Sequence, residues 1–414
     1  MLFVSATCTG CWDHREVEDL GIVLLTALDD APGGKIRLEV QILVPAALAG
    51  GGGGGVGGMG GGRGSGRKPY RNVDVEAETV FDAIRKLSME TPRRLFFAHN
   101  QVIVLSEKLA REKGIPPLLD FFDRNPQIRR DTWLVVARGD IKEIMDVPSQ
   151  LEVTPAQRVM GIINNREFSS QFAITRLGDF IEMVEDTGVE PFTAIIEMIP
   201  NTAVSRVALQ PGGPGPEPTH DIKLTGTAVF RRDKLVGWLD EREARGLMWV
   251  RGEVRGGPVK FNLPGDGGPQ NISVDILRAG RGGVRVEPRL VDGQLSMHIK
   301  TSVRVNLVEA QSPGLDLNKP ETIKRLEELL DEAIKEEIMA AVNRLQGDYR
   351  SDAFGFGQAV HRKYPRLWRQ VEGEWEDVFA GMPVSVDVKA TIRRTGLVNK
   401  PMQPRGGEKP QTGT

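Results

Sequence analysis

Both cysteines of this 414-residue chain, Cys8 and Cys11, lie in its first stretch, MLFVSATCTGCWDHRE. Cysteines at this C-x-x-C spacing could bind zinc, exchange disulfides or accept a lipid. A structural zinc site needs four ligands, but the sequence has no second cysteine pair and no histidine pair at H-x3-5-H spacing. A thioredoxin-like motif would follow a strand within a βαβ unit, whereas this one lies at the extreme N-terminus.

Lipid attachment fits this stretch best. Residues 1–6 resemble the end of an apolar signal segment, and small residues precede Cys11. In bacterial lipoproteins this arrangement is a lipobox: the cysteine sulfur receives diacylglycerol, and the peptide is cut just before it. Cys8 stands where a lipobox usually has leucine, and the segment lacks a positively charged start. We predict that residues 1–10 are a signal-peptide remnant and that Cys11 carries the lipid.

The composition narrows the class of protein. Lysine and arginine number 54 against 56 aspartates and glutamates, a balance that predicts no nucleic-acid partner. The sequence has no run of 18 apolar residues that could span a bilayer. It also lacks the G-x-S-x-G, H-E-x-x-H and G-K-[ST] signatures of common enzyme classes. We therefore expect a protein that is not an enzyme and that needs no cofactor or metal.

The N-terminal half alternates strands and helices. Residues 21–30 and 35–44 should form a hairpin, because apolar residues alternate in the second segment and a Pro-Gly-Gly turn joins the two. Glycine occupies 13 of the 17 positions from 50 to 66, which predicts a disordered loop over about 46–69. A helix is expected over 73–90, and a strand over 95–106 that contains His99 and Asn100. We expect these two polar residues to lie at a strand bend, or to be interior side chains with satisfied hydrogen bonds, and not to be catalytic.

Further along, the sequence predicts a helix from residue 116, a strand over 132–138 and a short helix that begins after Asp140. Two amphipathic helices and a strand follow. The Pro- and Gly-rich segment 210–221 is expected to be an exposed linker. After it come a hairpin that turns at Arg232-Asp233, a short helix and several strands.

One long helix is expected over 317–348. Its apolar stripe runs from Ile323 to Leu345 at helical spacing, Asn318 and Glu321 suggest a capping box, and Gly347 suggests its end. The aromatic side chains that follow it favour burial against a C-terminal sheet over exposure as a docking patch. They are Phe354, Phe356, Tyr364, Trp368, Trp375 and Phe379.

Three stretches together resemble the Ger(x)C family, the lipoprotein C subunits of bacterial spore germinant receptors. They are CWDHREVEDLGIV, KLTGTAVFRRDKLVGWLDEREARGLMW and SDAFGFGQAVHRKYPRLWRQVEGEWEDVFAGMPVSVDVKATIRRTG, in the family's order. The resemblance runs from Cys11 to about Gly396. The polyglycine tract departs from it and is expected to be an insertion in a loop of variable length.

The resemblance implies an α+β fold of three mixed α/β domains with mainly antiparallel or mixed sheets. We expect an N-terminal domain over 11–138, a middle domain over 139–255, a C-terminal domain over 256–397 and a disordered tail over 398–414.

The resemblance also implies a function and a location. A diacylglycerol on Cys11 would anchor the protein to the outer face of the spore inner membrane. There it would act with a membrane A subunit and a permease-like B subunit in nutrient-triggered germination. The alternative is a lipid-anchored solute-binding protein that captures the germinant itself, which would need a cleft between two lobes.

Overall fold

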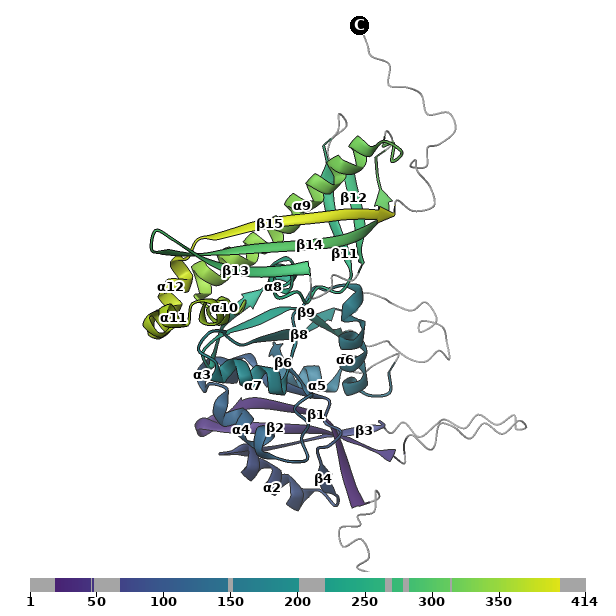
Figure 1. Ribbon diagram of the computed structural model, residues 1–414. Helices are drawn as coiled ribbons and strands as arrows, with labels where there is room; N and C mark the ends of the chain where they lie inside the picture. Colours follow the sequence, from purple (N-terminus) through teal and green to yellow (C-terminus); the bar gives the residue numbers. More distant parts are fainter. Residues whose placement is uncertain are drawn as a thin grey trace, which may run out of the picture.

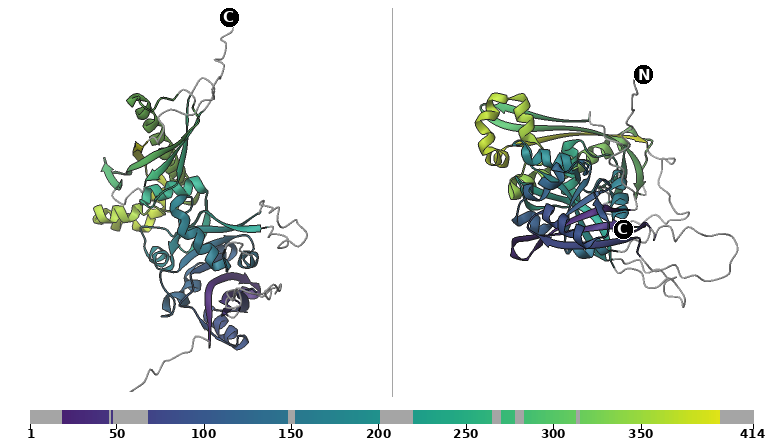
Figure 2. Two further views of the ribbon diagram at one scale, coloured as in Figure 1. Left: turned by 90° about the vertical axis from the view of Figure 1, so that its right-hand side faces the viewer. Right: turned by 90° about the horizontal axis from the view of Figure 1, so that it is seen from below.

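A computed structural model gives the fold of most of the chain. The structure describes residues 19–45, 47, 68–147, 152–200, 220–264, 270–277, 283–312 and 315–394. The expected signal remnant, Cys11, nearly all of the glycine tract, most of the 210–221 linker and the tail over 398–414 lie outside these residues. The described part forms two β-sheets at opposite ends of an elongated molecule, with helices around each (Figures 1 and 2).

The larger sheet is mixed. Its order is β10-β9-β8-β6-β5-β1-β2-β3, with β4 beside β1 and β7 beside β6. The pairs β1–β5, β5–β6 and β6–β8 are parallel, and the outer pairs are antiparallel. Its strands are β1 (Leu20–Ala31), β2 (Lys35–Leu43), β3 (Tyr70–Ala77), β4 (Arg94–Phe96), β5 (Val102–Ser106), β6 (Trp133–Arg138), β7 (Thr175–Arg176), β8 (Phe192–Pro200), β9 (His220–Arg231) and β10 (Lys234–Leu239).

Helices cover both faces of this sheet, because its central strands are apolar on both sides. In β5, Ile103 and Leu105 pack with α2, α3, α4 and α7, while Val102 and Val104 face α5 and α6 on the other side. Strands that are buried on both faces have continuous runs of apolar residues in their sequences. The helices are α2 (Val80–Glu90), α3 (Glu107–Glu112), α4 (Pro116–Arg124), α5 (Ile141–Asp146), α6 (Pro155–Asn164) and α7 (Leu177–Glu185).

Two expectations for the N-terminal half are wrong in detail. The helix expected over 73–90 begins only at Val80, since residues up to Ala77 belong to β3. There Val73 and Val75 pair with Val40 and Leu38 of β2. The strand expected over 95–106 is two short strands, β4 and β5, with His99 and Asn100 in the loop between them. The predicted hairpin of β1 and β2 is confirmed.

The smaller sheet has the order β11-β12-β14-β13, with β15 parallel to β14. Its other pairs are antiparallel. Its strands are β11 (Pro258–Leu263), β12 (Gln270–Leu277), β13 (Val284–Val291), β14 (Gln294–Ala310) and β15 (Val384–Arg394). Together the two sheets confirm the α+β class with mixed and antiparallel pairing.

The long helix α9 (Pro320–Asn343) lies across the smaller sheet beside β15 (Figure 1). The predicted stripe is confirmed, because Leu326, Leu330 and Ile334 and the stripe residues after them are buried. The predicted capping box is wrong: Lys319 is the N-cap residue, and Asn318 binds the Asp316 side chain. Gly347 does not end the helix, which continues as a π-helical segment to Tyr349.

Five of the six C-terminal aromatics are buried as predicted, whereas Tyr364 is only half-buried. They lie on and around the short helices α10 (Phe356–Lys363), α11 (Pro365–Val371) and α12 (Trp375–Gly381). Phe354, Phe356, Trp368, Trp375 and Phe379 are all buried in one core with the smaller sheet. These rings therefore stabilise the fold and do not form a docking patch.

Close contacts of α8 (Glu241–Arg251) and of the end of α9 help to join the two sheets. Gly246 of α8 lies so close to α9 that a Cβ there would be 2.1 Å from the Glu337 carbonyl oxygen. The Tyr349 hydroxyl accepts from the Trp238 amide at 3.0 Å and donates to the Trp238 carbonyl at 2.8 Å, at the edge strand β10. The two halves are thus packed directly against each other.

One of the two expected domain limits, residue 138, lies inside a sheet, and the other, residue 255, lies between the two sheets. Residue 138 is the last of β6, in the middle of the larger sheet, so that limit divides a continuous sheet. Residue 255 lies between α8 and β11, where the larger sheet has ended and the smaller one has not begun. The three-domain division stays a prediction.

Candidate functional site

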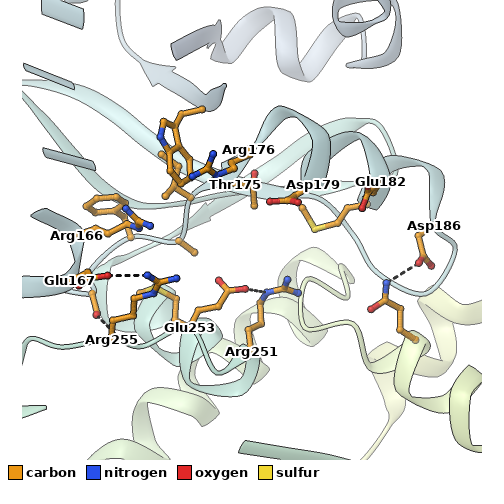
Figure 3. Close-up of a pocket in the computed structure, with 18 residues that line it drawn as sticks. Arg166, Glu167, Thr175, Arg176, Asp179, Glu182, Asp186, Arg251, Glu253 and Arg255 are labelled. Carbon is orange, nitrogen blue, oxygen red and sulfur yellow. Dashed lines mark hydrogen bonds and ion pairs between the residues drawn. The ribbon is translucent and has the colours of Figure 1, made fainter. Parts of the chain in front are cut away.

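A cavity of about 560 Å³ lies between the larger sheet and the helices of the second half (Figure 3). Its lining comes from β6, from the 3-10 turn Asn165–Phe168 and the segment that leads to β7, from α7, from the end of α8 and the residues after it, and from α10. Because these segments are distant in sequence, only the folded chain forms the cavity.

Two arginines pack against the Trp133 ring at this cavity. The guanidinium carbons of Arg176 and Arg166 lie 4.5 Å and 5.1 Å from the ring centre, in cation–π range. Arg176 also donates to the backbone oxygen of Asp131 at 3.1 Å and pairs with its carboxylate at 3.5 Å. The tryptophan, which is only 8% exposed, holds both cations at the cavity wall.

Arg166 differs from its neighbour in having no carboxylate partner among the described residues. Its guanidinium donates to the backbone oxygen of Ile163 at 2.9 Å. Burial lowers its pKa, and the positive charge of Arg255 lowers it further. Arg255 itself pairs with Glu167 at 2.9 Å. The arginine-rich wall therefore keeps one cation that an anionic group could neutralise.

The wall formed by α7 is acidic. Asp179, Glu182 and Asp186 lie along it, away from Arg166 and Arg255 (Figure 3). In the described part of the chain Asp179 forms no ion pair, whereas Glu182 lies 3.8 Å from Arg130. The cavity is thus bipolar in the charges that form no ion pair among the described residues, with Arg166 on one side and Asp179 on the other.

The acidic end of the cavity also joins the two halves of the chain. The Asp186 carboxylate accepts a hydrogen bond from the Gln358 side chain of α10 at 2.8 Å. The backbone N–H of Gln358 donates to the backbone carbonyl of Gly188 at 3.0 Å. Glycine is needed on both sides, because a Cβ on Gly357 would be 2.7 Å from the Gly188 Cα. A shift between the halves would therefore change the shape of the cavity.

A second cavity of about 400 Å³ shares Trp133, Arg166 and Arg176 with the first. Asn100, 5% exposed, also lines it. The Asn100 Oδ1 accepts from Thr26 at 3.2 Å, but its Nδ2 has no hydrogen-bond partner in the described structure. The expectation of a satisfied interior side chain therefore holds for only one of the two polar atoms of this amide.

These cavities are suited to binding. Thr175 donates its hydroxyl to the backbone oxygen of Phe192 at 2.8 Å and so has no adjacent base. Within the described residues no group of three or more His, Cys, Asp or Glu side chains could hold a metal. Guanidinium and carboxylate groups dominate the lining, and these bind charged partners.

No sequence pattern singled out Trp133, Arg166 or Arg176. No local motif marks them, because each lies on a different element. The adjacent acidic residues Asp240 and Glu241 have structural roles. Asp240 caps α8, and Glu241 binds Lys223 and Thr225.

Two family models match the chain in succession. The spore germination protein N-terminal domain matches residues 13–198, and the "Spore germination B3/GerAC like, C-terminal" model matches residues 225–396. Spore germination protein KC of Bacillus subtilis is 27% identical over 97% of this chain and 96% of its own length. Spore germination protein B3 of the same organism is 22% identical over 97% of this chain and 98% of its own.

A solved structure has the same fold. The crystal structure of the GerBC protein matches with a TM-score of 0.55 and 19% identity, over 89% of this chain and 96% of that one. The fold and the two consecutive matches define the chain as a protein of the spore germination class. It belongs to the Ger(x)C family.

Proposed function

We propose that the protein is the lipoprotein C subunit of a spore germinant receptor and is required for nutrient-triggered germination. It acts by assembly with a membrane A subunit and a permease-like B subunit, and it catalyses no reaction. The observation that carries this proposal is the match to spore germination proteins over 97% of the chain.

The anchor in this proposal is Cys11, which directly precedes the Trp12-Asp13 pair where the first family match begins. No helix in the described ranges is long and apolar enough to cross a bilayer. Diacylation of one cysteine supplies two acyl chains, and two chains give durable membrane attachment where one is marginal. The protein would then lie on the outer face of the spore inner membrane.

Substitution of the anchor tests the proposal. Spores that carry Cys11→Ala should germinate more slowly, because the tether raises the local concentration of the protein beside its partners. Cys8→Ala is the matched control and should germinate normally. Mass spectrometry of the mature N-terminus should find acylated Cys11. An unmodified Cys11 with an intact upstream peptide would contradict the anchor.

The bipolar cavity supports one alternative, the lipid-anchored solute-binding protein. A small molecule with both charges could place its anionic group at Arg166 and its cationic group at Asp179. Isothermal titration of the lipid-free protein against amino acids, sugars and nucleosides separates the two functions. Assembly alone predicts no saturable heat. Micromolar binding that Arg166→Ala abolishes would establish capture.

A further inference from the structure

The outer side of α2 presents apolar side chains to solvent. The helix buries Val80, Ala83 and Leu87 against the larger sheet. Phe81 and Met89 point away from that core and are 54% and 81% exposed. Single exposed apolar residues are ordinary, but this eleven-residue helix exposes two large ones, Met89 and the part of the Phe81 ring that its contact with Phe121, 6.2 Å between ring centres, leaves uncovered.

Cationic side chains surround this apolar pair. Arg85 lies over the Phe81 ring, with its guanidinium carbon 4.9 Å from the ring centre. Arg93 and Arg94 are exposed, and neither pairs with a carboxylate of the described residues. We call Phe81, Arg85, Met89, Arg93 and Arg94 the α2–β4 surface.

The acidic neighbours of this surface offset only part of its charge. Asp82 is neutralised by Lys86 at 2.9 Å. Glu78 and Glu90 lie at the two ends of α2 and remain exposed. The three arginines of the surface therefore leave a net positive charge around exposed apolar groups.

The chain connectivity places this surface close to the expected anchor. Arg94 of β4 pairs with Leu20, at the start of β1. Leu20 is only nine positions after Cys11, and a chain of that length spans at most about 30 Å. The smaller sheet lies at the opposite end of the molecule (Figure 1).

We propose that the α2–β4 surface lies against the anionic lipid bilayer that holds the anchor. Phe81 and Met89 enter the interface, and the arginines contact lipid headgroups, as on other membrane-surface helices. The contact directs the smaller sheet and its helices away from the bilayer. In the spore this arrangement rests on the acylation of Cys11 proposed above.

The test uses the full-length chain with Cys8→Ser and Cys11→Ser and an N-terminal histidine tag bound to nickel-chelating lipid. Vesicles contain equal parts of phosphatidylglycerol and phosphatidylcholine. Since these substitutions remove both native cysteines, an environment-sensitive dye can be placed at Met89→Cys, or at Ser88→Cys if the first variant folds poorly. Val308→Cys is the control, an apolar position 67% exposed on β14.

Dye emission at residue 89 should rise severalfold on the vesicles, while emission at residue 308 stays unchanged. Arg93→Glu with Arg94→Glu should weaken binding of the untagged chain to the same vesicles by about tenfold or more. The matched pair Arg362→Glu with Arg366→Glu should not. Equal emission at residue 89 with and without vesicles, or a larger rise at residue 308, would overturn the proposal. Because the tag replaces the lipid, neither result depends on whether Cys11 is acylated in cells.

Discussion

Replacement of Glu337 by alanine should greatly lower the free energy of unfolding. Glu337 of α9 is 5% exposed and accepts from three donors of α8. The Arg245 Nε donates at 2.9 Å, its Nη2 donates to the other carboxylate oxygen, and the Trp249 indole donates at 2.9 Å. This cluster holds α8 and α9 together and thereby joins the two halves of the molecule.

The size of this loss in unfolding free energy follows from the two buried groups that alanine would leave without a partner. Arg245, with a side chain only 12% exposed, would lose its counter-ion, and the Trp249 N–H would lose its acceptor in the core. Removal of one partner of a buried ion pair costs about 3–5 kcal/mol. The loss of the indole hydrogen bond is part of that cost and is not added to it. We therefore expect a loss of about 4 kcal/mol.

The assay is equilibrium unfolding in urea, followed by tryptophan fluorescence. The matched control is Glu336→Ala, one residue away, which breaks the exposed pair of Arg242 and Glu336 at 2.7 Å. Exposed pairs contribute about 0–1 kcal/mol, so this variant should unfold almost like the parent.

A double replacement of Arg245 and Glu337 by methionine separates charge from packing. It removes both charges together, so it should recover most of the stability lost in Glu337→Ala. A loss below about 1 kcal/mol for Glu337→Ala would refute the argument, because it would mean that Arg245 is solvated without its partner.

Three further perturbations have defined outcomes. Gly246→Ala should destabilise the protein by about 1–3 kcal/mol in urea unfolding, because of the clash with α9, whereas Gly161→Ala on α6, with only one contact at 3.9 Å, should be neutral or stabilising. Burial raises the pKa of Glu39 from 4.5 to about 7. Between those values the folded state keeps a proton that the unfolded state has lost, so stability should fall as the pH rises through this window; Glu39→Gln should flatten that slope and be more stable than the parent at pH above 7. Deletion of residues 50–66 should leave the melting temperature nearly unchanged, since loop closure changes by only about 0.6 kcal/mol per doubling of length; a large drop would show that the tract is packed.

Local patterns predicted most of the secondary structure. The α9 stripe could be predicted because about every fourth residue is apolar over six turns of the helix. The β1–β2 hairpin could be predicted because the Pro-Gly-Gly turn and the alternation of apolar residues both indicate the same structure. The start of α2 was misplaced because the predicted range 73–90 included Val73 and Val75, which are two residues apart and cannot share a helical face. Their alternation in 73–77 instead serves pairing with β2, a tertiary contact.

The candidate site had no such local signal. Trp133 and Arg176 are 43 positions apart, and they meet because β7 pairs with β6. Asn318 is not the cap because the helix begins one residue later, after Lys319, and the Asn318 side chain instead turns back to donate to Asp316. Sequence patterns thus specified the elements, whereas sheet order specified which charged groups share a cavity.

The Tyr349 hydroxyl at β10 has a consequence for self-association. β10 is an edge strand of the larger sheet, and an exposed edge can recruit a strand from another molecule. The phenol occupies both the N–H and the C=O of Trp238, and Gly237 leaves room for the ring, which would lie 2.2 Å from a Cβ at that position. A side chain from the end of α9 thereby blocks edge-to-edge aggregation here, without the proline or the row of lysines that other edge strands use.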